Sequence, residues 1–236
     1  MKRIKNVLIF FLAMVMLGAC RDKKSEKKEE ENIQQENTFV NPLKTEGAQC
    51  WANYYDGWYY YMQEAVDRLE LWRTRDITDL EHAEHKVIWI PKDPSNAHHL
   101  WGPEIHPIAG KWYVYYAASD DNMDNHQLFV LENSSADPFE GEFELKGRIS
   151  TDKNNNWAIH PNVFEHRGEW YYIWAEKVGV GKQISNLYIA RMKNGYTLDT
   201  VQVLLTTPDY DWERHGFWVN EGPAVIKHDG KIFLTY

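Results

Sequence analysis

A glycine followed by an alternating run rich in aromatic residues recurs four times in the chain, and this repeat restricts the folds that the chain can adopt. The four glycines lie 53, 58 and 62 residues apart. In two copies an aspartate precedes the glycine (Asp56-Gly57 and Asp229-Gly230), which is a strong signal for a two-residue β-hairpin turn. Ala-Gly and Arg-Gly occupy the same place in the other two. Each copy therefore predicts a strand, a tight turn and an aromatic strand. The glycine and the aromatic run that follows it occupy Gly57–Tyr61, Gly110–Tyr116, Gly168–Trp174 and Gly230–Tyr236.

Further short strands are expected after the aromatic runs. Third strands are predicted at Leu69–Trp72, Gln127–Leu131 and Leu187–Arg191, and fourth strands at Val87–Ile90 and Val201–Leu205. Units of four antiparallel strands at a period of roughly 50–60 residues are typical of β-propeller blades. We therefore expect an all-β fold with about four blades. The alternative is an all-β sandwich with coincidental hairpins.

The aromatic content has two possible uses. The chain has 11 Trp, 14 Tyr and 9 Phe, and flat rings of this kind serve both in cores and in the binding of ring-shaped polar ligands. Because the formal net charge is −9, the chain has no general footprint for nucleic acid, and we predict no nucleic-acid partner. Seven tryptophans stand at repeat-defined positions, which assigns much of the aromatic content to blade architecture: Trp51, Trp58, Trp101, Trp112, Trp157, Trp170 and Trp218.

Residues 1–19 are predicted to be a targeting signal. A short basic region precedes an uncharged apolar run, Val7–Leu17, which is too short to span a bilayer as a helix. The run ends in Leu-Gly-Ala before Cys20, which resembles a bacterial lipoprotein signal whose cleavage leaves Cys20 carrying lipid. An ordinary secretory signal with an incidental cysteine is the alternative. We predict a lipid-anchored protein of the cell envelope, in the outer membrane and facing the periplasm or the surface.

Residues 20–38 are predicted to be a charged tether, because they mix both signs of charge and have no aromatic residue to bury. The domain then covers residues 39–236. If Cys20 is acylated, Cys50 has no partner within the chain, so we predict no disulfide framework and a domain that depends on its hydrophobic core. Four repeat starts within this length predict a propeller that is incomplete at its C-terminus. We expect it to be a monomer.

A polar residue stands near a tryptophan where each repeat begins. Gln49 accompanies Trp51, Glu104 accompanies Trp101, His160 accompanies Trp157, and Glu221 accompanies Trp218. In a propeller the first strand of each blade lines the central channel, so we expect these four polar side chains to converge at its mouth. The alternative is coincidence, since polar residues commonly start strands.

Glu221 and Glu104 are the carboxylates among these four positions. Because Glu221 follows Phe217-Trp218-Val219, which we expect to be buried, its pKa should be raised, as suits a proton donor. A strand-edge glutamate paired with a lysine is the alternative. Glycoside hydrolysis uses two carboxylates across the scissile bond. Trp51, Trp101 and Phe217 are candidates for stacking on sugar, with core packing as the alternative.

Five segments resemble glycoside hydrolase family 43, and most closely its arabinofuranosidase and β-xylosidase members. The resemblance implies a five-bladed β-propeller and an inverting mechanism with an Asp base, an Asp that tunes the acid's pKa, and a Glu acid. The segments are Asn41–Leu43, Gly47–Gly57, Trp101–His106, Trp157–Gly168 and Asn220–Pro223.

Carried over residue by residue, the acid position is Glu221 and matches the family. Gln49 stands at the base position and His160 at the tuning position, so two of three catalytic residues are substituted. A neutral amide can orient a water but cannot accept its proton as a carboxylate does. His160 could itself serve as a base, but if charged it would lower the pKa of Glu221. Sugar-binding roles fall on Trp51, Trp101, Glu104, His106, Phe217 and Asn220.

The histidines give no metal-site spacing, and His98, His99, His106 and His126 are interpreted as wall or surface residues. Members of the family often hold a calcium ion in the channel, but no residue can be assigned to it here, so we predict no metal site and no required cofactor. The resemblance implies an exo-acting glycosidase of plant polysaccharide breakdown, acting on arabinose- or xylose-containing oligosaccharides, active or impaired. The alternatives are a catalytically inactive carbohydrate-binding lipoprotein and a decayed gene product without function.

Overall fold

The computed structural model describes residues 38–151, 156–178 and 184–236. It divides into two units, of which the first, Met1–Pro42, is described only at residues 38–42, as irregular backbone. The predicted signal at 1–19, the lipidation site Cys20 and the tether, apart from Thr38, lie outside the described residues. Among the described residues, no helix is long and apolar enough to cross a membrane.

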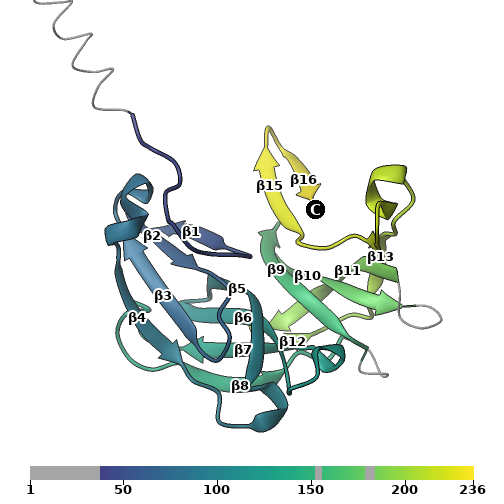
Figure 1. Cartoon of the computed structure of the whole chain (residues 1–236), viewed down its shortest axis with the longest axis horizontal. Helices are drawn as coiled ribbons and strands as arrows, with labels where there is room; N and C mark the ends of the chain where they lie inside the picture. Colours follow the sequence, from purple (N-terminus) through teal and green to yellow (C-terminus); the bar gives the residue numbers. More distant parts are fainter. Residues whose placement is uncertain (1–37, 152–155, 179–183) are drawn as a thin grey trace, which may run out of the picture. The chain divides into compact units, whose positions relative to one another are not determined.

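The second unit, Leu43–Tyr236, is built from four sheets that are antiparallel except for one parallel pair in the third, and the strand order follows the sequence in the first two (Figure 1). The first sheet has β1 (Trp51–Tyr55), β2 (Trp58–Met62), β3 (Leu69–Thr74) and β4 (Glu84–Trp89). The second has β5 (His98–Ile108), β6 (Lys111–Ser119), β7 (Gln127–Asn133) and β8 (Glu144–Arg148). The third has β9 (Ala158–His166), β10 (Glu169–Val178), β11 (Ile184–Asn194), β12 (Thr197–Leu198), β13 (Val203–Thr206) and β14 (Trp218–Val219), and the fourth has β15 (Ala224–His228) and β16 (Lys231–Thr235). Short 3-10 helices lie between strands: η1 (Ile77–His82), η2 (Pro94–Asn96), η3 (Met123–Asn125) and η5 (Asp211–Arg214).

The predicted hairpins are confirmed in all four repeats. Each joins two strands through two residues, and both residues have positive φ; at Asp56-Gly57 the angles are 48° and 80°. This is the backbone of a type I′ turn, whose twist matches that of the flanking strands. The predicted third strands are also confirmed, as parts of β3, β7 and β11. The predicted fourth strands overlap β4 and β13, but β4 ends at Trp89 and β13 begins only at Val203.

The second sheet is covered on both faces, and β6 shows why. Alternate residues of β6 point to opposite faces. Val114 and Tyr116 join the apolar cluster shared with the first sheet, whereas Tyr113 and Tyr115 join the cluster shared with the third. A strand buried on both sides must be apolar throughout, which explains the aromatic run. Sheets stacked face to face in sequence order are the blades of a propeller, so the all-β interpretation is confirmed.

The start of the fourth repeat differs from the prediction. Trp218 does not open that sheet, because β14 pairs in parallel with β11 of the third sheet. The first strand of the fourth sheet, β15, begins only at Ala224. Gly222, with φ of 64°, and Pro223, which lacks a backbone N–H, separate the two strands. The first strands of neighbouring sheets, β1 with β5, β5 with β9 and β9 with β15, lie next to one another (Figure 1).

Candidate active site

A cavity of about 330 Å³ opens where the four first strands begin. Each sheet contributes to its wall, and the predicted residues Gln49, Glu104, His160 and Glu221 all line it. The expected convergence is therefore present in the structure. The remaining lining residues are Cys50, Trp51, Gly102, Gly222, Pro223 and Ala224.

One backbone feature recurs at this cavity in every repeat and was not recognised in the sequence. The residue eight positions before each hairpin glycine has a left-handed backbone: φ is 48° at Gln49, 52° at Gly102, 50° at His160 and 64° at Gly222. A non-glycine residue with this conformation is uncommon and strained. The repeat therefore places one left-handed residue from each repeat on the cavity wall, and in two of them, Gln49 and His160, that residue is not glycine, is strained and carries the polar side chain.

Gly102 is the place where the cavity wall has no room for a side chain. A Cβ there would lie 2.9 Å from Cδ2 of His160, whereas a Cβ at Gly110, whose φ is also positive at 77°, would meet nothing within 4 Å. Both substitutions to alanine carry the left-handed backbone cost of about 1–2 kcal/mol. We expect Gly102→Ala to lower the free energy of unfolding by more than Gly110→Ala, because only Gly102→Ala displaces the imidazole. Urea unfolding of the two variants measures the difference, and equal losses would contradict this packing.

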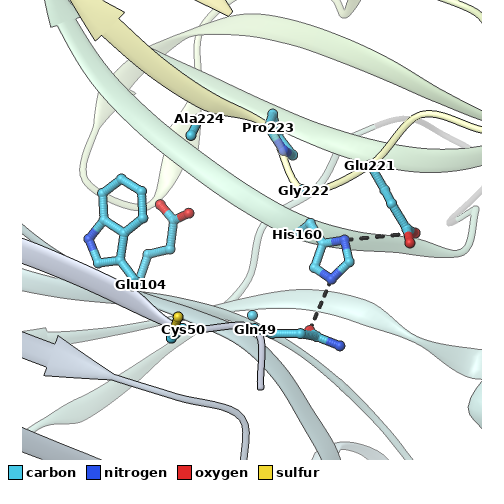
Figure 2. A pocket seen from close by; sticks show the side chains of 10 residues that line it. Gln49, Cys50, Glu104, His160, Glu221, Gly222, Pro223 and Ala224 are labelled. Carbon is cyan, nitrogen blue, oxygen red and sulfur yellow. Dashed lines mark hydrogen bonds and ion pairs between the residues drawn. The ribbon is translucent and has the colours of Figure 1, made fainter. Parts of the chain in front are cut away.

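His160 lies between Gln49 and Glu221 (Figure 2). Its Nε2 is 2.9 Å from Gln49 Oε1, and its Nδ1 is 3.8 Å from Glu221 Oε2. Because an amide oxygen can only accept, Nε2 donates, and in the neutral ring Nδ1 then carries the lone pair. Nδ1 is buried and has no hydrogen-bond partner within the described residues. His160 thus presents an acceptor toward the carboxyl group of Glu221.

Burial keeps His160 neutral and favours the protonated form of Glu221. Burial, together with the neighbouring His126, lowers the pKa of His160 to about 4. Burial also raises the pKa of Glu221, while Lys177 opposes this shift. Near neutral pH the imidazole is therefore uncharged and does not lower the pKa of Glu221. A protonated carboxyl group beside a neutral acceptor is an arrangement that suits general-acid catalysis.

The low pKa of His160 predicts a pH dependence of stability. The native state binds the imidazole proton only near pH 4, whereas the unfolded state binds it below the ordinary value of 6.5. Between these values the unfolded state holds more protons, so the free energy of unfolding falls as the pH falls, by at most about 1.4 kcal/mol per pH unit from this group. We expect His160→Asn to flatten the curve by about this slope. Other titrating groups stay the same in both proteins, and parallel curves in urea unfolding from pH 4 to 7 would contradict the assignment.

Glu104 forms a separate buried group on the same cavity, apart from His160 in Figure 2. Its Oε2 lies 2.9 Å from His106 Nε2, and Asn162 Nδ2 donates to the same oxygen at 3.0 Å. Burial raises the pKa of Glu104 well above its usual range, although the bond from Asn162 opposes this, and burial lowers the pKa of His106 to about 3. The proton therefore resides on the carboxyl group, which donates to the imidazole. A protonated carboxyl group cannot act as a base, so Glu104 is suited to hydrogen-bonding a ligand.

The comparison with protein families identifies the chain. Residues 26–236 match the model of Glycosyl hydrolases family 43. The chain belongs to glycosyl hydrolase family 43. The predicted resemblance is thereby confirmed, and the four sheets are blades of the propeller of this family.

Relatives within family 43 are similar over most of the chain. The Extracellular exo-alpha-(1->5)-L-arabinofuranosidase of Streptomyces chartreusis is 39% identical over 203 residues, which are 84% of this chain and 62% of that protein. The crystal structure of the alpha-L-arabinofuranosidase from Lactobacillus brevis has a TM-score of 0.77 at 37% identity, and the match covers 83% of this chain and 64% of that one. A thermostable family-43 glycoside hydrolase, at 24% identity and a TM-score of 0.69, shares the fold. The chain thus spans less than two thirds of the length of these relatives.

Of the other site residues predicted for this family 43 chain, some line the cavity and others do not. Trp51 lines the cavity and packs on His106, with ring centroids 5.1 Å apart. Trp101 instead stacks on His126 at 4.1 Å and is not among the lining residues. Phe217 was expected to be buried, and this was wrong: it is 81% exposed, in the connection between η5 and the two-residue strand β14.

Asn220 also lies outside the cavity lining. It is 1% exposed, and its side chain donates to Thr206 and Glu213 rather than facing the cavity. Cys50, Pro223 and Ala224 line the cavity but were not predicted as site residues. These three residues could have been predicted from the sequence, because they lie within three positions of Gln49 or Glu221.

Proposed function

We propose that this family 43 chain is an exo-acting glycosidase that removes terminal α-L-arabinofuranosyl residues, with Glu221 as general acid. The observation that carries the proposal is the position of Glu221 on the cavity, beside the neutral acceptor His160 and 3.8 Å from it. The arabinofuranosidase names of the relatives from Streptomyces chartreusis and Lactobacillus brevis favour arabinofuranosides over xylosides.

The proposed reaction is a single displacement with inversion at the anomeric carbon. Glu221 donates its proton to the glycosidic oxygen as the bond to the anomeric carbon breaks, a water attacks from the opposite face and loses its proton to solvent water, and solvent then reprotonates Glu221. Gln49 stands at the base position, where its amide can orient this water but cannot take the proton. Its oxygen, moreover, already accepts from His160. We infer that the chain hydrolyses slowly.

The structure also offers a reason to consider a second function. Gln49 and His160 form a 2.9 Å hydrogen bond between neutral groups at the two positions where the family carries carboxylates. A pocket that retains its shape and lacks its base would bind a sugar without turning it over. The second candidate is therefore a catalytically inactive carbohydrate-binding protein.

Hydrolysis and binding assays distinguish the two functions. The purified protein is incubated with 4-nitrophenyl α-L-arabinofuranoside and 4-nitrophenyl β-D-xyloside, and calorimetry measures binding of arabino- and xylo-oligosaccharides. Release of arabinose supports the glycosidase. Binding without release, by a protein that remains folded, supports the binding protein, and neither binding nor release contradicts both.

We propose further that the chain is held at the cell envelope by lipid on Cys20. The support is the sequence of residues 1–20, and the charged residues that follow suit a tether. Incorporation of labelled palmitate by wild-type cells, and its absence in Cys20→Ala, is the expected result. Equal labelling of both proteins would contradict the anchor.

A further inference from the structure

A second carboxylate, that of Glu213 in η5, binds the segment that carries Glu221. Glu213 is 3% exposed. Its Oε2 accepts the backbone N–H groups of Asp209 and Tyr210, both at 2.6 Å. Its Oε1 accepts Nδ2 of Asn220 at 3.1 Å and the hydroxyl of Tyr236 at 3.0 Å. All four donors thus converge on one buried anion.

Asn220, the residue before Glu221, is held from several directions. Its backbone N–H donates to the carbonyl of Ser185 at 3.0 Å, and the Ser185 hydroxyl donates to its carbonyl at 3.3 Å. Its side-chain Nδ2 also donates to Thr206 Oγ1 at 3.2 Å. Because Asn220 is 1% exposed, these bonds compete little with water. The backbone at the base of Glu221 is therefore fixed.

The Glu221 side chain itself is held weakly. Its side chain is 44% exposed, and among the described residues its carboxylate has the 3.8 Å contact with His160 and no hydrogen bond. Its placement on the cavity must therefore come from the backbone on either side. Pro223 limits the backbone after it, and Asn220 limits the backbone before it.

We propose that Glu213 is a positioning residue that, through Asn220, holds the carboxyl group of Glu221 at the cavity. This inference rests on the proposed role of Glu221 as general acid. Displacement of a general acid slows reactions with poor leaving groups, which need the proton, far more than reactions with good ones. A general loss of structure slows both alike.

The donors around Glu213 allow a matched set of variants. In Glu213→Gln a single oxygen remains for the two backbone N–H groups, so the new amide N–H₂ faces the N–H₂ of Asn220 and the two repel. Glu213→Gln/Asn220→Asp exchanges donor and acceptor, which restores the bond and keeps the net charge. Tyr236→Phe removes the other bond to Oε1 and leaves Asn220 in place.

The first measurement compares methyl and 4-nitrophenyl α-L-arabinofuranosides. The quantity compared is the ratio of kcat for the 4-nitrophenyl glycoside to kcat for the methyl glycoside. We expect Glu213→Gln to raise this ratio by about tenfold or more, because the methyl glycoside loses more activity. The double variant should recover most of this loss, and Tyr236→Phe should keep the wild-type ratio within about twofold. An unchanged ratio in Glu213→Gln would overturn the proposal.

The second measurement does not depend on turnover. Carboxyl ¹³C NMR follows the titration of Glu221, assigned with Glu221→Gln, in the same variants. We expect the Glu221 midpoint to fall toward its ordinary value in Glu213→Gln, because the released side chain enters water, and to return in the double variant. A wild-type midpoint in Glu213→Gln would overturn the positioning role. If the wild type hydrolyses neither glycoside, the proposed function fails and this titration alone decides the role of Glu213.

Discussion

Gln49→Asp/His160→Asp is expected to raise the rate of hydrolysis of 4-nitrophenyl α-L-arabinofuranoside by about 10²–10⁴-fold, the range that a general base contributes. The double substitution supplies a carboxylate at the base position and another beside the acid. Aspartate tolerates the left-handed backbone that both positions require, where φ is 48° and 50°. The substitution therefore adds chemistry without a new backbone cost.

The two positions must change together because they share a hydrogen bond. In Gln49→Asp alone, the new carboxylate faces the Nε2–H of His160 and raises the pKa of the imidazole. A cationic imidazole beside Glu221 then lowers the pKa of the acid, so the single variant should gain less than the double one. His160→Asp alone leaves the site without a base.

The matched control is Gln49→Asn/His160→Asn, which has side chains of the same size as the aspartates and no carboxylate. We expect no gain in rate from it. Initial rates of the five proteins (the wild type, the two single aspartate variants, the double aspartate variant and the double asparagine control) at saturating substrate, with unfolding curves to establish that each is folded, complete the experiment. Equal rates for the double aspartate variant and the wild type would contradict the assignment of the base position.

The hairpins and most strands could be predicted because their causes are local. An Asp-Gly turn and an alternating aromatic run contain in a few residues the information that fixes two strands and their register. The convergence of Gln49, Glu104, His160 and Glu221 followed from the repeat, since residues that stand six to nine positions before the hairpin glycine of each repeat meet at the same end of the channel. The family of the chain was predicted from the same motifs.

The features that could not be predicted depend on distant parts of the chain. Trp218 pairs with β11 and Phe217 faces water because of where the third sheet ends, which the sequence near them does not record. The protonation of Glu104 depends on burial beneath neighbouring sheets and on His106. Two of the four donors to Glu213, the backbone N–H groups of Asp209 and Tyr210, are local, but the other two come from Asn220 and Tyr236, and nothing in the loop of Glu213 indicates these.

The general acid gives the last prediction. Glu221→Gln keeps the size of the side chain and cannot donate a carboxylic proton, so we expect kcat for methyl α-L-arabinofuranoside to fall by about 10²–10⁴-fold. The 4-nitrophenyl glycoside should lose much less, because its leaving group departs without protonation. This comparison is best made in the Gln49→Asp/His160→Asp protein, where the rates are highest.

The pH profile tests the same residue independently. Activity needs the protonated form of Glu221, so kcat/KM should fall as the pH rises through its pKa, which burial raises above the ordinary 4.5. With Glu221→Gln this basic limb should disappear, while binding of arabino-oligosaccharides, measured by calorimetry, should persist because the cavity keeps its shape. A basic limb that survives in Glu221→Gln would assign the proton to another group. Glu104 would then be the group to test, because it also lines the cavity and burial raises its pKa well above the usual range.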